Sequence, residues 1–129
     1  MGERARRILL VEDDRLLRKA ADATLRRQGF TVLTAVDGEE ALRLARAEAP
    51  ELILLDLIMP KLQGFEVLRI LKEDAATAPI PVIVLSNLGQ ESDMRRAIEA
   101  GAAAYLVKAN LSLQELVKKV EETLKGGEA

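Results

Sequence analysis

Short apolar or β-branched runs alternate along this chain with longer segments in which apolar residues recur every three or four positions. Such runs are typical of strands covered on one or both faces, and the wider spacing is typical of amphipathic helices. The runs predict five strands, at residues 7–11, 30–35, 52–56, 82–85 and 104–107. The spaced segments predict five helices, between Asp14 and Gly29, at 39–49, 64–75 and 90–100, and from Ser112 onward.

Residues at the predicted helix ends agree with these limits. Asp14 stands where a helix N-cap is expected, and Gly29 stands at the C′ position of the same helix. Pro50 ends the second helix, and Ser112 with Glu115 has the spacing of a capping box. The apolar face predicted for the first helix consists of Leu16, Leu17, Ala20, Ala21 and Leu25.

Five strand–helix pairs in succession predict the α/β class, with a parallel sheet, helices on both faces and right-handed crossovers. A doubly wound sheet of five strands most often has the flavodoxin-like order 2-1-3-4-5. A length of 129 residues fits one domain. We expect that domain to span residues 1–125, with residues 126–129 as a flexible tail or the start of a linker.

The composition narrows the chemistry. The chain has no cysteine and no histidine, which excludes thiolate chemistry and the commonest general base. A metal would therefore be a hard cation on oxygen ligands. A net charge of -2 and 2% aromatic residues predict no direct contact with nucleic acid. No signal peptide or membrane-spanning run is present, so we expect a cytoplasmic protein without membrane contact.

In the predicted strand order, polar residues at four strand ends meet at one edge of the sheet. Glu12 and Asp13 follow the first strand, Asp56 ends the third, Ser86 follows the fourth and Lys108 follows the fifth. Three clustered carboxylates repel one another unless a cation lies between them, and Mg²⁺ accepts carboxylates and water as ligands. A carboxylate nucleophile, a hydroxyl, a lysine and Mg²⁺ together suit phosphoryl transfer.

Each of these residues also has a purely structural interpretation. Asp56 could cap the next loop, and Glu12 with Asp13 could favour the positive end of a helix dipole. Ser86 could be a turn residue and Lys108 a solvated strand end. For a single residue the structural interpretation is the more common one. Their occurrence together at successive strand ends of one topology favours a shared site.

Four stretches of the chain resemble the receiver domain of response regulators, the phosphoacceptor module of two-component signalling. They read ILLVEDD, LLDLIMPKLQG, VIVLSN and AAAYLVKA, and the resemblance covers essentially the whole chain. It implies that Asp56 accepts a phosphoryl group and that Lys108 pairs with the phosphoryl oxygens. It also implies that Ser86 binds a phosphoryl oxygen and acts with Tyr105 as a switch. The implied Mg²⁺ ligands are Glu12, Asp13, Asp56 and the backbone carbonyl of Ile58.

Some positions depart from the common receiver pattern. Ala109 follows Lys108 where the family usually has a proline after a cis bond. A cis bond to alanine costs roughly 3 kcal/mol, so the loop either retains strain or takes a trans path. Asn87 is larger than the small residue that usually follows the switch hydroxyl, and Gln63 replaces a common acidic residue. Ile58 and Leu88 are apolar where many relatives are polar, which predicts a long-lived phosphorylated state.

The resemblance also implies partners. With no histidine of its own, the chain would take its phosphoryl group from a histidine kinase or a histidine phosphotransfer protein. Arg15, Arg18 and Lys19 could help to dock that donor or could form an ordinary solvated helix face. The readout surface would include residues 90–101, Tyr105 and the last helix, and would bind a downstream protein. Phosphorylation-dependent homodimerisation stays open.

Two other functions compete with a phosphorylated receiver. The first is a Mg²⁺-dependent phosphatase with an aspartyl-phosphate intermediate, although such enzymes usually carry the nucleophile in an Asp-x-Asp-x-Thr motif after strand one. The second is a receiver-like scaffold that is never phosphorylated. Intact Asp56, Ser86 and Lys108 argue against the scaffold, whereas Ala109 leaves it open.

Overall fold

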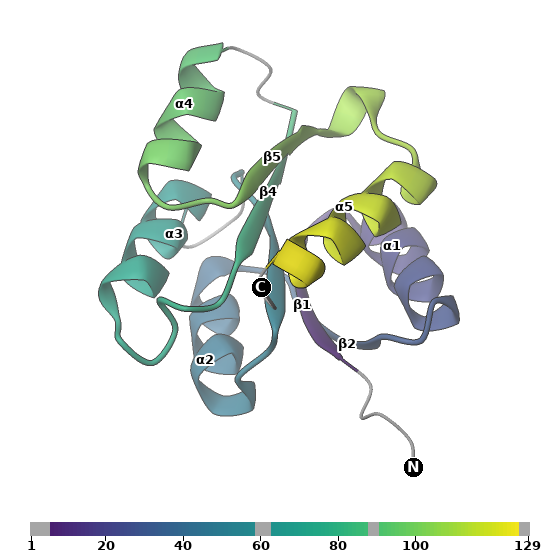
Figure 1. The fold of residues 1–129 in the computed structure, drawn as a ribbon, viewed down its shortest axis with the longest axis horizontal. Helices are drawn as coiled ribbons and strands as arrows, with labels where there is room; N and C mark the ends of the chain where they lie inside the picture. Colours follow the sequence, from purple (N-terminus) through teal and green to yellow (C-terminus); the bar gives the residue numbers. More distant parts are fainter. Residues whose placement is uncertain (1–5, 59–62, 88–90, 127–129) are drawn as a thin grey trace.

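A five-stranded parallel sheet forms the centre of the molecule, in the order β2-β1-β3-β4-β5 (Figure 1). The computed structural model describes residues 6–58, 63–87 and 91–126. This topology confirms the predicted α/β class and the strand order 2-1-3-4-5. The strands are β1 (Arg7–Val11), β2 (Thr31–Ala35), β3 (Leu52–Asp56), β4 (Val82–Ser86) and β5 (Ala104–Val107).

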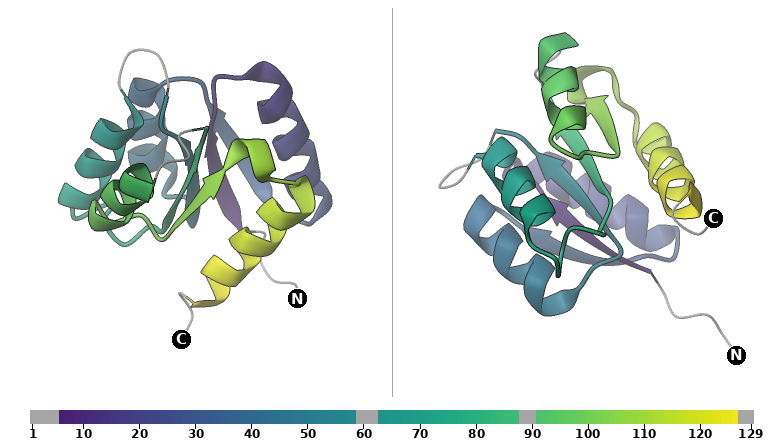
Figure 2. Two further views of the ribbon diagram at one scale, coloured as in Figure 1. Left: turned by 90° about the horizontal axis from the view of Figure 1, so that it is seen from above. Right: turned by 60° about the vertical axis from the view of Figure 1, so that its left-hand side comes forward.

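Helices cover both faces of the sheet (Figure 2). The apolar residues of α2, α3 and α4 pack on one face, and those of α1 and α5 pack on the other. Strands β1, β3 and β4 have buried side chains on both faces, which explains their nearly continuous apolar sequences. The helices are α1 (Arg15–Arg27), α2 (Gly38–Glu48), α3 (Gly64–Glu73), α4 (Glu91–Glu99) and α5 (Leu113–Gly126), with a 3-10 turn η1 at Lys108–Asn110.

Side-chain caps fix the helix ends that lie nearest the carboxyl edge of the sheet. The carboxylate of Asp14 accepts hydrogen bonds from the amides of Leu16 (3.0 Å) and Leu17 (3.2 Å), as an N-cap residue does. Ser112 and Glu115 bond reciprocally in a capping box, as predicted. Both α1 and α5 therefore start at defined residues just after a strand or turn that ends at this edge.

The predicted burial of α1 is wrong at two positions. Leu16 is 82% exposed and Ala20 is also exposed, whereas Ala21 and Leu25 are buried. The helix packs along the line that joins Ala21 and Leu25, which are one turn apart, and Leu16 and Ala20 lie off that line around the helix axis. On α4, Ile98 is likewise 48% exposed. Within the described ranges no helix has the length and apolar composition to cross a membrane.

Candidate functional site

The acidic residues predicted to meet do lie together at the carboxyl edge of the sheet. Strand β1 pairs with β3 in a register that sets Val11 beside Leu55, so the residues that follow are neighbours. One carboxylate oxygen from each of Glu12, Asp13 and Asp56 lies within 4.8 Å of the others. Glu12 and Asp56 are buried, whereas Asp13 is exposed. The cluster is therefore a buried acidic pair with one carboxylate open to solvent.

Lys108 reaches into this cluster from the end of β5. Its Nζ lies 2.7 Å from Oε1 of Glu12 and donates a hydrogen bond of 3.0 Å to Oδ2 of Asp56. The peptide bonds of the described residues are all trans, and η1 starts at Lys108 itself. The chain thus takes the trans path that the sequence left open, and Ala109 does not prevent Lys108 from meeting both carboxylates.

The charges of this cluster do not balance. Burial raises the pKa of Glu12 to about 7, and the nearby Asp56 adds to this, whereas Lys108 and the amide of Asp14 act in the opposite direction. Burial lowers the pKa of Lys108, but its contacts with Glu12 and Asp56 outweigh burial and raise it overall. Three carboxylates and one ammonium leave a deficit of positive charge, which a divalent cation can fill. All three donors are oxygens and one is open to water, so the residues present fit Mg²⁺.

Asp56 is held in one orientation by two donors. Its Oδ1 accepts a hydrogen bond of 3.1 Å from the amide of Ile58, and its Oδ2 accepts the one from Lys108. Ile58 itself is 58% exposed. The role of its carbonyl as a metal ligand stays a prediction, and Leu88 lies outside the described residues.

Ser86 and Tyr105 lie next to each other on adjacent strands. Ser86 is fully buried at the end of β4, and Tyr105 is half-buried on β5. The two side chains share a hydrogen bond. Burial raises the pKa of Tyr105, and the hydrogen bond with Ser86 opposes that shift. The predicted switch residues are therefore in direct contact.

Arg18 contacts the backbone beside the acidic cluster, which the sequence did not indicate. Its Nη1 donates hydrogen bonds to the backbone carbonyls of Glu12 (3.0 Å) and Asp13 (3.3 Å). Its guanidinium thus binds the backbone at Glu12 and Asp13. Arg15 and Lys19, the other two basic residues considered for docking a donor, are exposed. Nothing in a spacing of five or six residues marks such a contact, because it depends on how the loop turns between β1 and α1.

Gly64 presses against the backbone at the end of β3, at Asp56 and Leu57. Its amide donates to the carbonyl of Leu57 (2.9 Å). A Cβ at this position would lie 2.4 Å from Cα of Leu57 and 2.6 Å from the carbonyl oxygen of Asp56. These are backbone atoms directly beside the site, so they cannot move aside as the end of a flexible side chain could.

We expect Gly64→Ala to destabilise the protein by about 2–3 kcal/mol, because the added methyl forces the β3–α3 connection apart. Denaturant unfolding measures this change. Gly126→Ala is the matched control, since Gly126 is helical and a Cβ there meets nothing within 4 Å. Equal stability of Gly64→Ala and the wild type would contradict this close approach.

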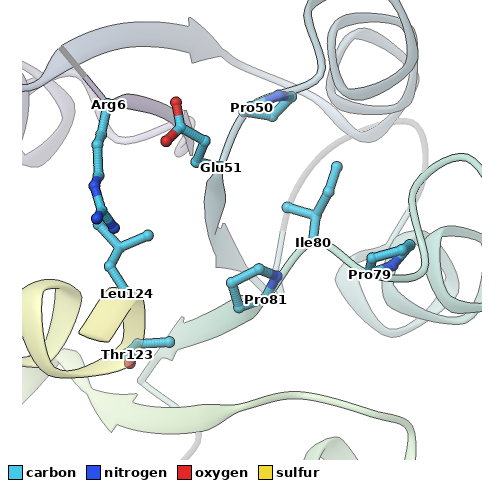
Figure 3. Close-up of a pocket in the computed structure, with 8 residues that line it drawn as sticks. All are labelled: Arg6, Pro50, Glu51, Pro79, Ile80, Pro81, Thr123 and Leu124. Carbon is cyan, nitrogen blue, oxygen red and sulfur yellow. The ribbon is translucent and has the colours of Figure 1, made fainter. Parts of the chain in front are cut away.

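A hollow lies at the opposite, amino edge of the sheet (Figure 3). Its volume is about 310 Å³, and its residues precede β1, β3 and β4 or come from the end of α5. Its lining is mostly apolar, with Arg6 and Glu51 as its two charged residues. This lining suits neither a metal ion nor phosphoryl transfer. Its lining residues are Arg6, Pro50, Glu51, Pro79, Ile80, Pro81, Thr123 and Leu124.

Comparison with known proteins agrees with this geometry. Residues 8–121 match the family model described as the response regulator receiver domain. The chain is 44% identical over 115 residues to a gliding motility regulatory protein of Myxococcus xanthus, covering 89% of this chain and 15% of the relative. It is 38% identical over 119 residues to the DNA-binding dual master transcriptional regulator RpaA of Synechocystis, covering 92% and 49%. The chain thus spans about half or less of the length of these relatives.

Solved structures give the same result. A CheY-like response regulator receiver domain from Methanospirillum hungatei superposes with a TM-score of 0.90 at 26% identity, covering 97% of this chain and 98% of that one. The receiver domain of a sensor histidine kinase from Pseudomonas aeruginosa, with a magnesium ion coordinated in its active site cleft, superposes with a TM-score of 0.86 at 28% identity, covering 95% and 99%. The chain belongs to the response-regulator receiver domains, which are signalling modules of two-component systems.

Proposed function

We propose that Asp56 accepts a phosphoryl group from a phosphohistidine, with Mg²⁺ held by Glu12, Asp13 and Asp56. The observation that carries this proposal is the contact of Lys108 with Asp56 within the acidic cluster. This contact places the ammonium group of Lys108 beside the Asp56 carboxylate. The carboxylates of Glu12 and Asp13, which suit a divalent ion as ligands, lie next to it. Mg²⁺, when bound, would neutralise charge on the transferring phosphoryl oxygens.

The nucleophile in this transfer is the Asp56 carboxylate. One of its oxygens attacks the phosphorus of the donor, the phosphorus–nitrogen bond breaks, and its electron pair stays on the donor imidazole. The product is an acyl phosphate on Asp56. Attack of water on that phosphorus later returns the free carboxylate and inorganic phosphate. Lys108 remains beside the oxygens throughout and offsets part of their charge.

The contact between Ser86 and Tyr105 suggests how the new charge is transmitted. A serine hydroxyl has one donor hydrogen and two acceptor lone pairs. Ser86 can therefore donate its one hydrogen either to the hydroxyl oxygen of Tyr105, as its lowering effect on the Tyr105 pKa indicates, or to a phosphoryl oxygen. Phosphorylation would then bias the positions of β4, β5 and α4, whose Asp93 lies close enough to Tyr105 to affect its titration. This surface, with α5, is the readout face in our proposal.

The partners follow from the same proposal. A histidine kinase or phosphotransfer protein is the donor, and exposed Arg15, Lys19 and Leu16 are available on α1 for its docking. The expectation of no direct nucleic-acid contact applies to the receiver alone, because relatives such as RpaA are DNA-binding regulators over a longer chain. Homodimerisation, the domain limit at residue 125 and the cytoplasmic location stay predictions.

Acetyl phosphate or beryllofluoride with Mg²⁺ tests this function against both alternatives. NMR spectra of the wild type should change around Asp56, Ser86 and Tyr105 when the reagent and Mg²⁺ are added, and should not change when a chelator is present. Unchanged spectra under saturating Mg²⁺ would favour the scaffold. Rapid turnover of a small phosphomonoester would favour the phosphatase.

We expect Ile58→Asn to shorten the lifetime of the phosphorylated state by about tenfold. Ile58 is exposed and its amide bonds to the Asp56 carboxylate, so we expect its apolar side chain to limit the approach of water, whereas an amide side chain can hold water. Loss of the phosphoryl group is followed by intact-protein mass measurement after acetyl phosphate is removed. Ile98→Asn, at another exposed apolar position on α4, is the control. Equal lifetimes of Ile58→Asn and the wild type would contradict the shielding.

A further inference from the structure

The three carboxylates of the acidic cluster are not held in the same way. Glu12 accepts a hydrogen bond of 3.0 Å from the amide of Asp14 and contacts Lys108. Asp56 accepts from Ile58 and Lys108. The Asp13 side chain, in contrast, makes no hydrogen bond or ion pair with any residue of 6–58, 63–87 or 91–126. Its position therefore depends on its backbone.

Arg18 bonds to the peptide groups on both sides of the Asp13 Cα, and the second of these groups also donates, through the amide of Asp14, to Oε2 of Glu12. The carbonyl of Glu12 belongs to the peptide group before the Asp13 Cα, and the carbonyl of Asp13 belongs to the one after it. Both accept hydrogen bonds from Nη1 of Arg18. Because peptide groups are planar, the orientation of these two groups fixes φ and ψ of Asp13. The direction of its Cα–Cβ bond follows.

We propose that Arg18 is a positioning residue that points the Asp13 carboxylate at the magnesium site. This inference rests on the proposed function, since it concerns the same ion. Bonds from a charged guanidinium to carbonyls are stronger than neutral ones, so they can restrain an exposed loop. Arg18 itself is only half-buried in the second turn of α1, which carries the restraint from a regular helix to an irregular turn.

Positioning and simple electrostatics predict opposite effects of removing Arg18. A guanidinium near a cation site repels Mg²⁺, so the loss of its charge alone would tighten binding. The loss of a restraint on a ligand weakens binding, because the ligand must be ordered when the ion arrives. Outer groups that orient metal ligands are typically worth about 10- to 100-fold in affinity. The sign of the change therefore separates the two effects.

The test is the Mg²⁺ dissociation constant of the unphosphorylated protein, measured by NMR titration with MgCl₂. We expect Arg18→Met to raise it about tenfold, because methionine keeps the helix propensity and an unbranched apolar stem but donates no hydrogen bond. Lys19→Met removes the same charge from an exposed neighbour and should leave affinity unchanged or slightly tighter. Arg18→Lys should fold and lose less Mg²⁺ affinity than Arg18→Met. Lysine keeps a charged donor but lacks the planar guanidinium.

A double-mutant cycle with Asp13→Asn separates positioning from a general effect on the fold. Once the Asp13 carboxylate is absent, Arg18→Met should cause no further loss of Mg²⁺ affinity. Equal or tighter Mg²⁺ binding by Arg18→Met and Arg18→Lys would overturn the inference, as would a full additional loss in the Asp13→Asn background. A wild type that binds no Mg²⁺ would instead overturn the proposed function on which the inference rests.

Discussion

Asp56→Asn is expected to abolish phosphoryl uptake from acetyl phosphate completely. The amide that replaces the carboxylate is a very weak nucleophile and cannot form an acyl phosphate under these conditions. The side chain keeps its size, and its oxygen can still accept from Lys108 or Ile58, so the fold should persist. Intact-protein mass spectrometry with Mg²⁺ should show one added phosphate on the wild type and none on the variant.

Asp14→Asn is the matched control for that result. Asp14 is also acidic and lies next to the site, but its carboxylate caps α1 and is exposed. Asparagine is an equally good N-cap residue, so this variant loses one charge without losing the cap. It should take up one phosphate as the wild type does. Uptake by Asp56→Asn, or a loss in both variants, would contradict the assignment of Asp56.

Lys108→Met is expected to slow phosphorylation by about 100-fold at saturating Mg²⁺. Lys108 is the one cation that contacts both buried carboxylates among the described residues. A fixed donor aimed at developing charge is typically worth factors of about 100 to 1,000 in rate. Methionine fills a similar volume without the charge. The rate of mass increase with acetyl phosphate measures the effect.

The same substitution should tighten Mg²⁺ binding, because it removes a cation from between Glu12 and Asp56. Slower phosphorylation together with tighter Mg²⁺ binding would distinguish a direct role of Lys108 from a damaged metal site. Lys118→Met, at an exposed position on α5, should change neither quantity. A phosphorylation rate near that of the wild type would show that Lys108 only balances charge in the resting protein.

The architecture and the meeting of the acidic residues could be predicted from the sequence. Unbroken apolar runs such as 52–56 specify strands buried on both faces, and strand–helix alternation leaves few topologies. Strand order then decides which strand ends are neighbours, which is why Glu12 and Asp56 could be brought together without coordinates. Helix caps at Asp14 and Ser112 are local, and local spacing sufficed to find them.

Other features depend on how loops and helices are finally packed. The exposure of Leu16 follows from the rotation of α1 about its axis, which a pattern of apolar residues constrains only loosely. The contacts of Arg18 with two carbonyls depend on the turn between β1 and α1. The trans bond before Ala109 and the contact of Gly64 with Leu57 are likewise properties of irregular backbone, for which the sequence offered alternatives or no signal.

The central claim is that one carboxylate, Asp56, carries the phosphoryl group in a reaction that needs Mg²⁺. Borohydride reduction after treatment with acetyl phosphate converts an acyl phosphate to an alcohol, and peptide mass spectrometry then identifies the modified residue. We predict modification at residue 56 alone, and none when a chelator replaces Mg²⁺. Modification at Glu12 or Asp13 in place of Asp56, or no modified residue in the presence of Mg²⁺, would contradict the claim.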